Sequence, residues 1–159
     1  MSGTKKYTQL LLLACLLLFG TAAFAQEVPG DYQEVLKSLD RKGDFKDGVL
    51  KANIPRSDLK MTVAGVATPT PFGFGGWVAF TKTSDGGEVM MGDLVLLQEE
   101  VNPVMSALLD NGIEVTALHN HMINDEPRLF FMHFWANDDA GKLAQGLKAA
   151  LSHVNIAKG

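Results

Sequence analysis

Three of the four histidines in the chain lie within fifteen residues, at positions His119, His121 and His133. Imidazole binds Zn(II), Cu(II) and Fe(II), and it also transfers protons near neutral pH. A single histidine on a strand is usually a polar residue that bonds to the backbone. Three at this spacing indicate a metal site or a catalytic site, and the alternative is three polar residues on a solvated or partly buried face.

Whether these imidazoles meet depends on the register of a β-hairpin. His119 and His121 are two residues apart on an expected strand, so their side chains share a face. A loop with an odd number of residues centred on Glu126 places His133 opposite His119 and within reach of His121. A loop with an even number turns His133 to the other face. The apolar residues at 129–135 fit either face, so both registers remain open.

If the three imidazoles converge, they suit a divalent ion such as Zn, Cu, Mn or Fe, with a position left open for water or substrate. Glu126 at the hairpin tip, or Asp93 in the expected strand 88–97, is the expected fourth ligand or catalytic base. In an enzyme the ion lowers the pKa of its bound water towards about 7. In a carrier protein a fourth protein ligand closes the site.

Other side chains near the histidines suggest binding of a small molecule. Asn120 and Arg128 flank the cluster, and a guanidinium binds a carboxylate or phosphate through two parallel hydrogen bonds. Phe72, Phe74 and Trp77 lie in or beside a loop rich in glycine and proline and are expected to wall a pocket. The alternative function is therefore a metal-free module that binds a small ligand or another component of the cell envelope.

The first 25 residues have the pattern of a secretory signal peptide. Lys5 and Lys6 precede an apolar run at 10–19, and Ala23-Phe24-Ala25 is typical of a cleavage site. The run is too short for a comfortable membrane span of about 20 residues. We expect cleavage after Ala25 and export of a single domain, residues 26–159, without a transmembrane segment, to the periplasm or the medium.

A second interpretation of the same segment is a lipoprotein signal at 12–15, which leaves a lipidated Cys15 as the first residue. In either case the exported chain has no free thiol, because Cys15 is the single cysteine. Disulfide bonds, cysteine nucleophiles and thiolate metal ligands are therefore excluded.

Composition narrows the class of protein further. The chain has 159 residues, of which 47% are hydrophobic and 20% charged, enough for one ordinary globular domain. Its formal net charge is −4, and loss of Lys5 and Lys6 makes it more negative. A surface for nucleic acid is not expected on such an acidic chain.

Hydrophobic periodicity predicts three helices among six strands. The expected helices cover 31–39, 98–111 and a C-terminal segment capped by Asn137 or Asp138, and the expected strands cover 49–54, 59–66, 77–82, 88–97, 113–122 and 128–135. This order predicts an α+β fold, with a mixed, mostly antiparallel sheet and helices packed on it. The second half of the chain, β-α-β-β-α, resembles a ferredoxin-like unit.

The chain resembles the LppY/LpqO family, an exported bacterial domain of unknown function (DUF1259). The matching segments span nearly all of the exported chain and lie at 54–59, 92–96, 100–104, 115–122 and 126–135. The resemblance implies export and no established activity. Many members look like two tandem copies of the domain, so the resemblance also implies that a single copy pairs into a homodimer.

Overall fold

The computed structural model describes residues 26–156, and both the expected signal peptide and Cys15 lie outside this range. The helices are α2 (Gly30–Leu39), α3 (Gln98–Asp110) and α4 (Ala140–Leu151), with a 3-10 turn η1 (Thr70–Phe72). The strands are β1 (Gly43–Lys46), β2 (Val49–Ile54), β3 (Met61–Val63), β4 (Val66–Thr68), β5 (Gly76–Lys82), β6 (Glu88–Leu97), β7 (Glu114–Asn120), β8 (Asp125–Glu126) and β9 (Leu129–Asp138).

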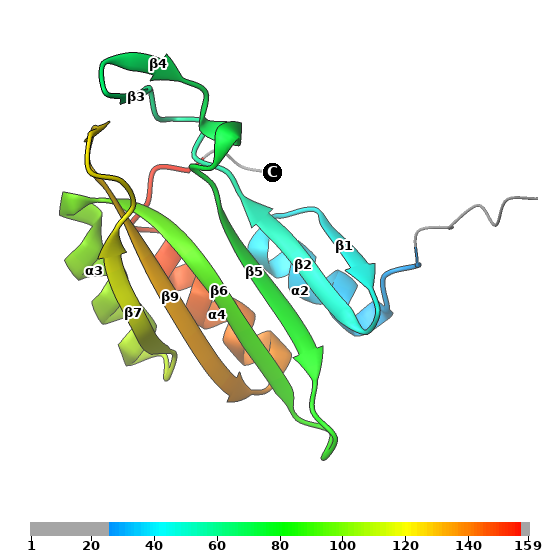
Figure 1. Cartoon of the computed structure of the whole chain (residues 1–159). Coiled ribbons are helices and arrows are strands. Elements are labelled where there is room, and N and C mark those ends of the chain that lie inside the picture. The colour runs from blue at the N-terminus through cyan, green and yellow to red at the C-terminus, as the bar shows by residue number, and fades with distance from the viewer. Residues whose placement is uncertain (1–25, 157–159) are drawn as a thin grey trace, which may run out of the picture.

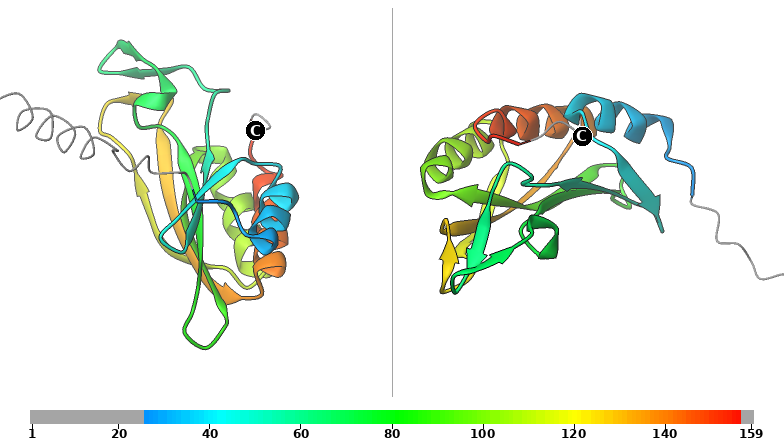
Figure 2. Two further views of the ribbon diagram at one scale, coloured as in Figure 1. Left: turned by 90° about the vertical axis from the view of Figure 1, so that its right-hand side faces the viewer. Right: turned by 90° about the horizontal axis from the view of Figure 1, so that it is seen from above.

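The strands form two sheets, shown in Figure 1. The larger has the order β1-β2-β5-β6-β9-β7, and every neighbouring pair in it is antiparallel. The helices cover one face of this sheet, and Figure 2 shows β3, β4 and η1 on the opposite side. The smaller sheet has the order β4-β3-β8. The predicted α+β class is confirmed; the large sheet was expected to be mixed and mostly antiparallel, and all of its neighbouring strands are antiparallel.

Each face of the large sheet has its own hydrophobic core. In β9 the even-numbered residues Met132, Phe134 and Ala136 pack under the helices. The odd-numbered Leu129 and Phe131 pack with residues of the small sheet and its connections. The alternation follows from the two-residue period of a strand. The odd-numbered face is only partly covered, and it carries the residues of interest for function.

Several expected elements agree closely with the structure. Strands 49–54 and 88–97 are confirmed with the expected bounds. The expected strand 59–66 is instead two short strands, because Ala64 and Gly65 adopt positive φ angles and form a tight turn. The last helix is capped by the Asp139 side chain, which accepts from the Lys142 N–H, and not by Asn137 or Asp138.

Gly92 lets β6 approach its neighbours closely. A Cβ added there would lie 2.4 Å from the carbonyl oxygen of Trp77 and 2.4 Å from Cζ of Phe134. We expect Gly92→Ala to lower the free energy of unfolding by roughly 1–2 kcal/mol, because backbone cannot move aside cheaply. Urea unfolding checks this, and Gly30→Ala, where an added Cβ meets nothing within 4 Å, is the control.

Within residues 26–156, none of the helices combines the length and the apolar character that a membrane crossing requires.

Candidate functional site

A β-bulge in β7 turns His119 to the open face of the sheet, the face that carries His133. Val115 pairs with Phe134, but Ala117 pairs with His133, so Thr116 is an extra residue without a partner. Before the bulge Val115 packs under the helices; after it, the odd-numbered residues of β7 share the face of His133. Bulges turn side chains in this way and are common beside functional sites. His119 therefore lies diagonally across from His133.

Of the two registers left open by the sequence, the hairpin has the parity of the odd-numbered loop, but its pairing is displaced by two residues from the one centred on Glu126. His119 pairs with Phe131, which centres the connection on Asp125 instead of Glu126. Phe131 consequently stands between His121 and the other two histidines. The four rings form a column of nearly parallel planes: the ring centroids are 4.2 Å apart from His121 to Phe131, 6.0 Å from Phe131 to His119 and 5.2 Å from His119 to His133. The structure brings two imidazoles together and keeps the third apart.

The two adjacent imidazoles contact each other through their Nε2 atoms, which are 3.0 Å apart. His119 Nδ1 lies 3.0 Å from the main-chain oxygen of Asn120. A carbonyl oxygen only accepts, so Nδ1 of His119 carries a proton and donates it. In a neutral His119 ring, Nε2 then presents its lone pair to His133.

Asp93 lies behind His133, directly opposite it in the β6–β9 pair. The carboxylate oxygen Oδ1 is 3.8 Å from His133 Nδ1. Asp93 is buried, and its Oδ1 makes no hydrogen bond to the described residues. Burial raises the pKa of Asp93, while the neighbouring His133, His119 and His121 oppose that rise. The carboxylate thus lies within the electrostatic field of all three histidines.

His121 has a different environment from the histidine pair. Its ring stacks on Phe131 and meets the edge of Phe74 at a centroid distance of 5.1 Å. Burial lowers the pKa of His121, and the nearby carboxylates of Asp125 and Asp93 oppose that shift. His121 Nδ1 and Asp125 Oδ1 are both buried without a hydrogen-bond partner in the described chain. Asp125 Oδ2 accepts from the Leu129 N–H and so braces the hairpin.

The remaining residues expected around the histidines hold the loop of the hairpin. Glu126 is exposed in β8, where its backbone pairs with Thr62. The side chains of Asn120 and Arg128 bond to the main-chain oxygens of Met122 and Ile123. Across residues 26–156, no three His, Cys, Asp or Glu side chains are arranged to hold one metal ion together. Among the expected site residues, the three that lie close together are His119, His133 and Asp93.

A cavity of about 390 Å³ is bordered by Trp77, the residue of β5 that pairs with Asp93. It is lined by Asn53, Pro55, Arg56, Ser57, Thr70, Pro71, Gly73, Gly75, Gly76 and Trp77. Trp77 pairs with Asp93, which pairs with His133, so these three residues lie in one row across the sheet. Of the aromatic residues expected to wall a pocket, Trp77 does so; Phe74 is fully buried in the second core, and Phe72 is 78% exposed.

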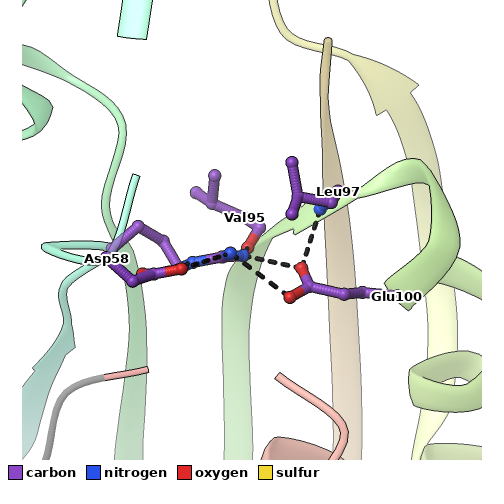
Figure 3. A network of polar contacts seen from close by, with 5 residues as sticks. Asp58, Val95, Leu97 and Glu100 are labelled. Atoms are coloured by element: carbon purple, nitrogen blue, oxygen red, sulfur yellow. Dashed lines mark hydrogen bonds and ion pairs between the residues drawn. The ribbon is translucent and has the colours of Figure 1, made fainter. Parts of the chain in front are cut away.

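Arg56, one of the lining residues, is buried and forms the polar network shown in Figure 3. Its guanidinium donates to both carboxylate oxygens of Asp58, to both of Glu100 and to the carbonyl oxygen of Val95. All five of its N–H groups are therefore bonded. Glu100 also accepts from the Leu97 N–H and caps α3. The network anchors the loop between β2 and β3, and it ties this loop both to β6 and to the start of α3.

The comparisons with known proteins place the chain in a family. A family model described as Domain of Unknown Function (DUF1259) matches residues 33–153, which is most of the chain. The chain belongs to the DUF1259 family. This match confirms the resemblance to DUF1259 that was found in the sequence. No curated protein and no solved structure matches this DUF1259 chain. Its function must therefore be argued from the geometry of the site.

Sequence reasoning overlooked two features of the DUF1259 site. Asp125 lies in a polar stretch, Asn124-Asp125-Glu126, which is typical of an exposed turn, yet it is 4% exposed. No signal in the sequence marks its burial. Asn53 and Gly75 line the cavity but lie far from the histidines in sequence, so only the pairing of β2, β5 and β6 reveals their position.

The buried environment of His121 gives a pH dependence that can be tested on the chelator-treated DUF1259 chain. Because its pKa is lowered from 6.5 in the folded chain, folded protein binds fewer protons there than unfolded protein. Unfolding therefore takes up a proton below pH of about 6.5, and stability falls as the pH falls. We expect urea unfolding to show a smaller loss between neutral and mildly acidic pH in His121→Gln than in wild type. His153→Gln should match wild type; an equal loss in His121→Gln would contradict the assignment.

Proposed function

We propose that this chain is an exported protein that binds a divalent metal ion through Nε2 of His119 and Nε2 of His133. The observation that carries the proposal is the 3.0 Å separation of these two nitrogens. Two imidazole nitrogens at about 2.0–2.1 Å from one ion lie about 2.9–3.4 Å apart at bond angles of about 90–109°. The pair therefore has the spacing of two ligands of one ion.

The hydrogen-bond partners of the rings favour the same arrangement. His119 Nδ1 donates to the Asn120 carbonyl oxygen, which leaves the Nε2 lone pair free. Asp93 lies on the Nδ1 side of His133 and favours a proton there. With both protons on Nδ1, two lone pairs face each other, and a cation between them removes their repulsion. A carboxylate behind a ligating histidine is a recurrent feature of metal sites.

Two protein ligands leave other coordination positions for water or for a substrate. His133 is 39% exposed at its side chain, and His119 is exposed, so solvent reaches this site. We assign Asp93 to the support of His133 and not to direct coordination, because it faces Nδ1. Imidazole ligands favour Zn(II) and Cu(II) over the harder ions Mg(II) and Ca(II). An ion with open positions polarises a bound substrate or acidifies bound water.

The proposal of export rests on the sequence of residues 1–25, where a basic head, an apolar run and Ala23-Phe24-Ala25 follow one another. An envelope or extracellular location also suits a site made of imidazole and carboxylate groups, since it needs no reduced thiol.

Calorimetric titration of Zn(II) and Cu(II) into the chelator-treated chain, residues 26–159 without an affinity tag, tests the metal proposal. We expect one equivalent of one of these ions to bind in wild type. His119→Ala and His133→Ala should each abolish this binding, and His121→Ala should retain it because Phe131 separates its ring from the pair. His153→Ala, on the exposed segment after α4, is the control for loss of a histidine elsewhere.

Either of two results would reject the metal proposal. If neither ion binds the wild-type chain, or if binding is the same in His119→Ala and His133→Ala as in His153→Ala, the pair is a hydrogen-bonded structural contact and the metal proposal is rejected.

A further inference from the structure

We propose that the cavity beside Trp77 is a binding site for a neutral saccharide of one or two rings. Its volume of about 390 Å³ is within the range of small-molecule sites, which runs from about 300 to 1,000 Å³. The proposal does not depend on the metal, since the lining residues do not include the histidines or Asp93.

The charges of the lining residues favour a neutral ligand. Among the described residues that line it, Arg56 is the single ionisable one. Every N–H group of its guanidinium already donates to Asp58, Glu100 or Val95. Two carboxylates, those of Asp58 and Glu100, also more than offset its charge. An anionic ligand therefore finds no free donor on Arg56, and a cationic ligand finds no carboxylate in the lining.

The remaining groups match a ring that carries hydroxyl groups. Asn53, Ser57 and Thr70 provide an amide and two hydroxyls, and these side chains make no hydrogen bond within residues 26–156. Pro55, Pro71 and Trp77 provide apolar surfaces. Sugars present C–H faces and hydroxyl edges, so they need this combination of apolar surface and uncharged donors and acceptors.

The walls of the cavity are held in place before a ligand arrives. Lys51 Nζ lies 4.7 Å from the centroid of the Trp77 ring and steadies it. The Arg56 network ties the segment with Pro55 and Ser57 to β6 and α3. Proline walls have no side-chain rotamer freedom to lose on binding, and fixed walls reduce the cost of association.

Gly75 offers a way to fill the cavity without strain. It lines the cavity, an added Cβ meets no atom within 4 Å, and its φ lies outside the left-handed range, unlike that of Gly73. Gly75→Leu should therefore place a side chain where the ligand binds. Gly30→Leu, at the exposed start of α2, is the matched control because an added Cβ there also meets no atom within 4 Å.

The experiment is a fluorescence titration of the chain, residues 26–159, in the presence of chelator. Trp135→Phe serves as the background, because it leaves Trp77 as the single tryptophan. The probes are N-acetylglucosamine and maltose, with inorganic sulfate as the anionic comparison. We expect saturable quenching or enhancement with at least one of the two sugars, no response to sulfate, and about tenfold or greater loss of affinity in Gly75→Leu.

Three results would overturn the proposal: no saturable response to either sugar at tens of millimolar, saturation by sulfate instead of sugar, or equal sugar affinity in Gly75→Leu and Gly30→Leu. Because chelator is present throughout, these outcomes are independent of the metal titration. Failure of the saccharide site therefore leaves the metal proposal untouched, and the reverse also holds.

Discussion

Replacement of Arg56 by alanine is expected to lower the free energy of unfolding by about 3–5 kcal/mol. The guanidinium is 1% exposed and satisfies carboxylate oxygens of Asp58 and Glu100 together with a main-chain oxygen. Without it, the Glu100 carboxylate remains buried with one N–H donor, from Leu97. An uncompensated buried charge is far more costly than the loss of one surface ion pair.

Urea unfolding measures this effect, and Arg56→Lys separates charge from geometry. A lysine ammonium keeps the charge but cannot form two forked pairs at once, so we expect most of the loss to remain. Arg128→Ala is the control: this exposed side chain makes one hydrogen bond of 3.4 Å, and its removal should cost less than about 0.5 kcal/mol. A comparable small cost at Arg56 would show that the network contributes little net stability.

Replacement of Asp93 by asparagine is expected to have two opposite effects. Metal affinity should fall by about 10–100-fold, since outer carboxylates of this kind orient the ligating histidine and raise its basicity. The metal-free chain should become more stable at neutral pH. Burial raises the pKa of Asp93, so above its ordinary value of 3.8 the folded state binds more protons there than the unfolded state, and stability falls as the pH rises through that window.

Metal titration and urea unfolding of the same Asp93→Asn preparation test both effects together. If Asp93 only supports the fold, its replacement should lower the stability of the chain and leave its metal affinity unchanged. Met91→Leu, two residues away on the same face of β6, is the matched control and should leave metal affinity unchanged. A drop in stability without a drop in affinity would remove Asp93 from the site.

The α+β architecture follows from periodicity that is visible in the sequence. Strand 88–97 is apolar on both faces along much of its length, which matches its central place between two cores. Strands β1 and β8 have only four and two residues, which is too short for an alternation of apolar and polar residues to reveal them. Their formation depends on pairing with β2 and β3.

The sequence predicted a meeting of the histidines only on the condition of one hairpin register. The sequence limits His133 to two faces, and the bulge at Thr116 decides between them. That bulge depends on tertiary packing: Val115 packs under the helices while Ala117, two residues later, pairs with His133 on the open face. The two-residue displacement that inserts Phe131 beside His121 follows from the short connection centred on Asp125.

Long-range contacts also decided the roles of Arg56 and Phe74. Pairing of Arg56 with Asp58 inside a turn is a local event and was predictable, and the structure contains it. Glu100 lies forty-four residues away, so the buried network requires knowledge of the fold. Phe74 lies in a glycine-rich segment that is typical of exposed loops, yet the small sheet and the hairpin enclose it completely.

The most direct test of the metal site is a nitrogen-15 NMR spectrum of the histidine side chains with and without one equivalent of Zn(II). We predict that His119 and His133 both carry their proton on Nδ1 in the Zn(II) form, with large shifts confined to their Nε2 atoms, and that His153 is unchanged. If Zn(II) leaves the Nε2 resonances of His119 and His133 where they were, or moves those of His153 equally, the two histidines do not form a Zn(II) site.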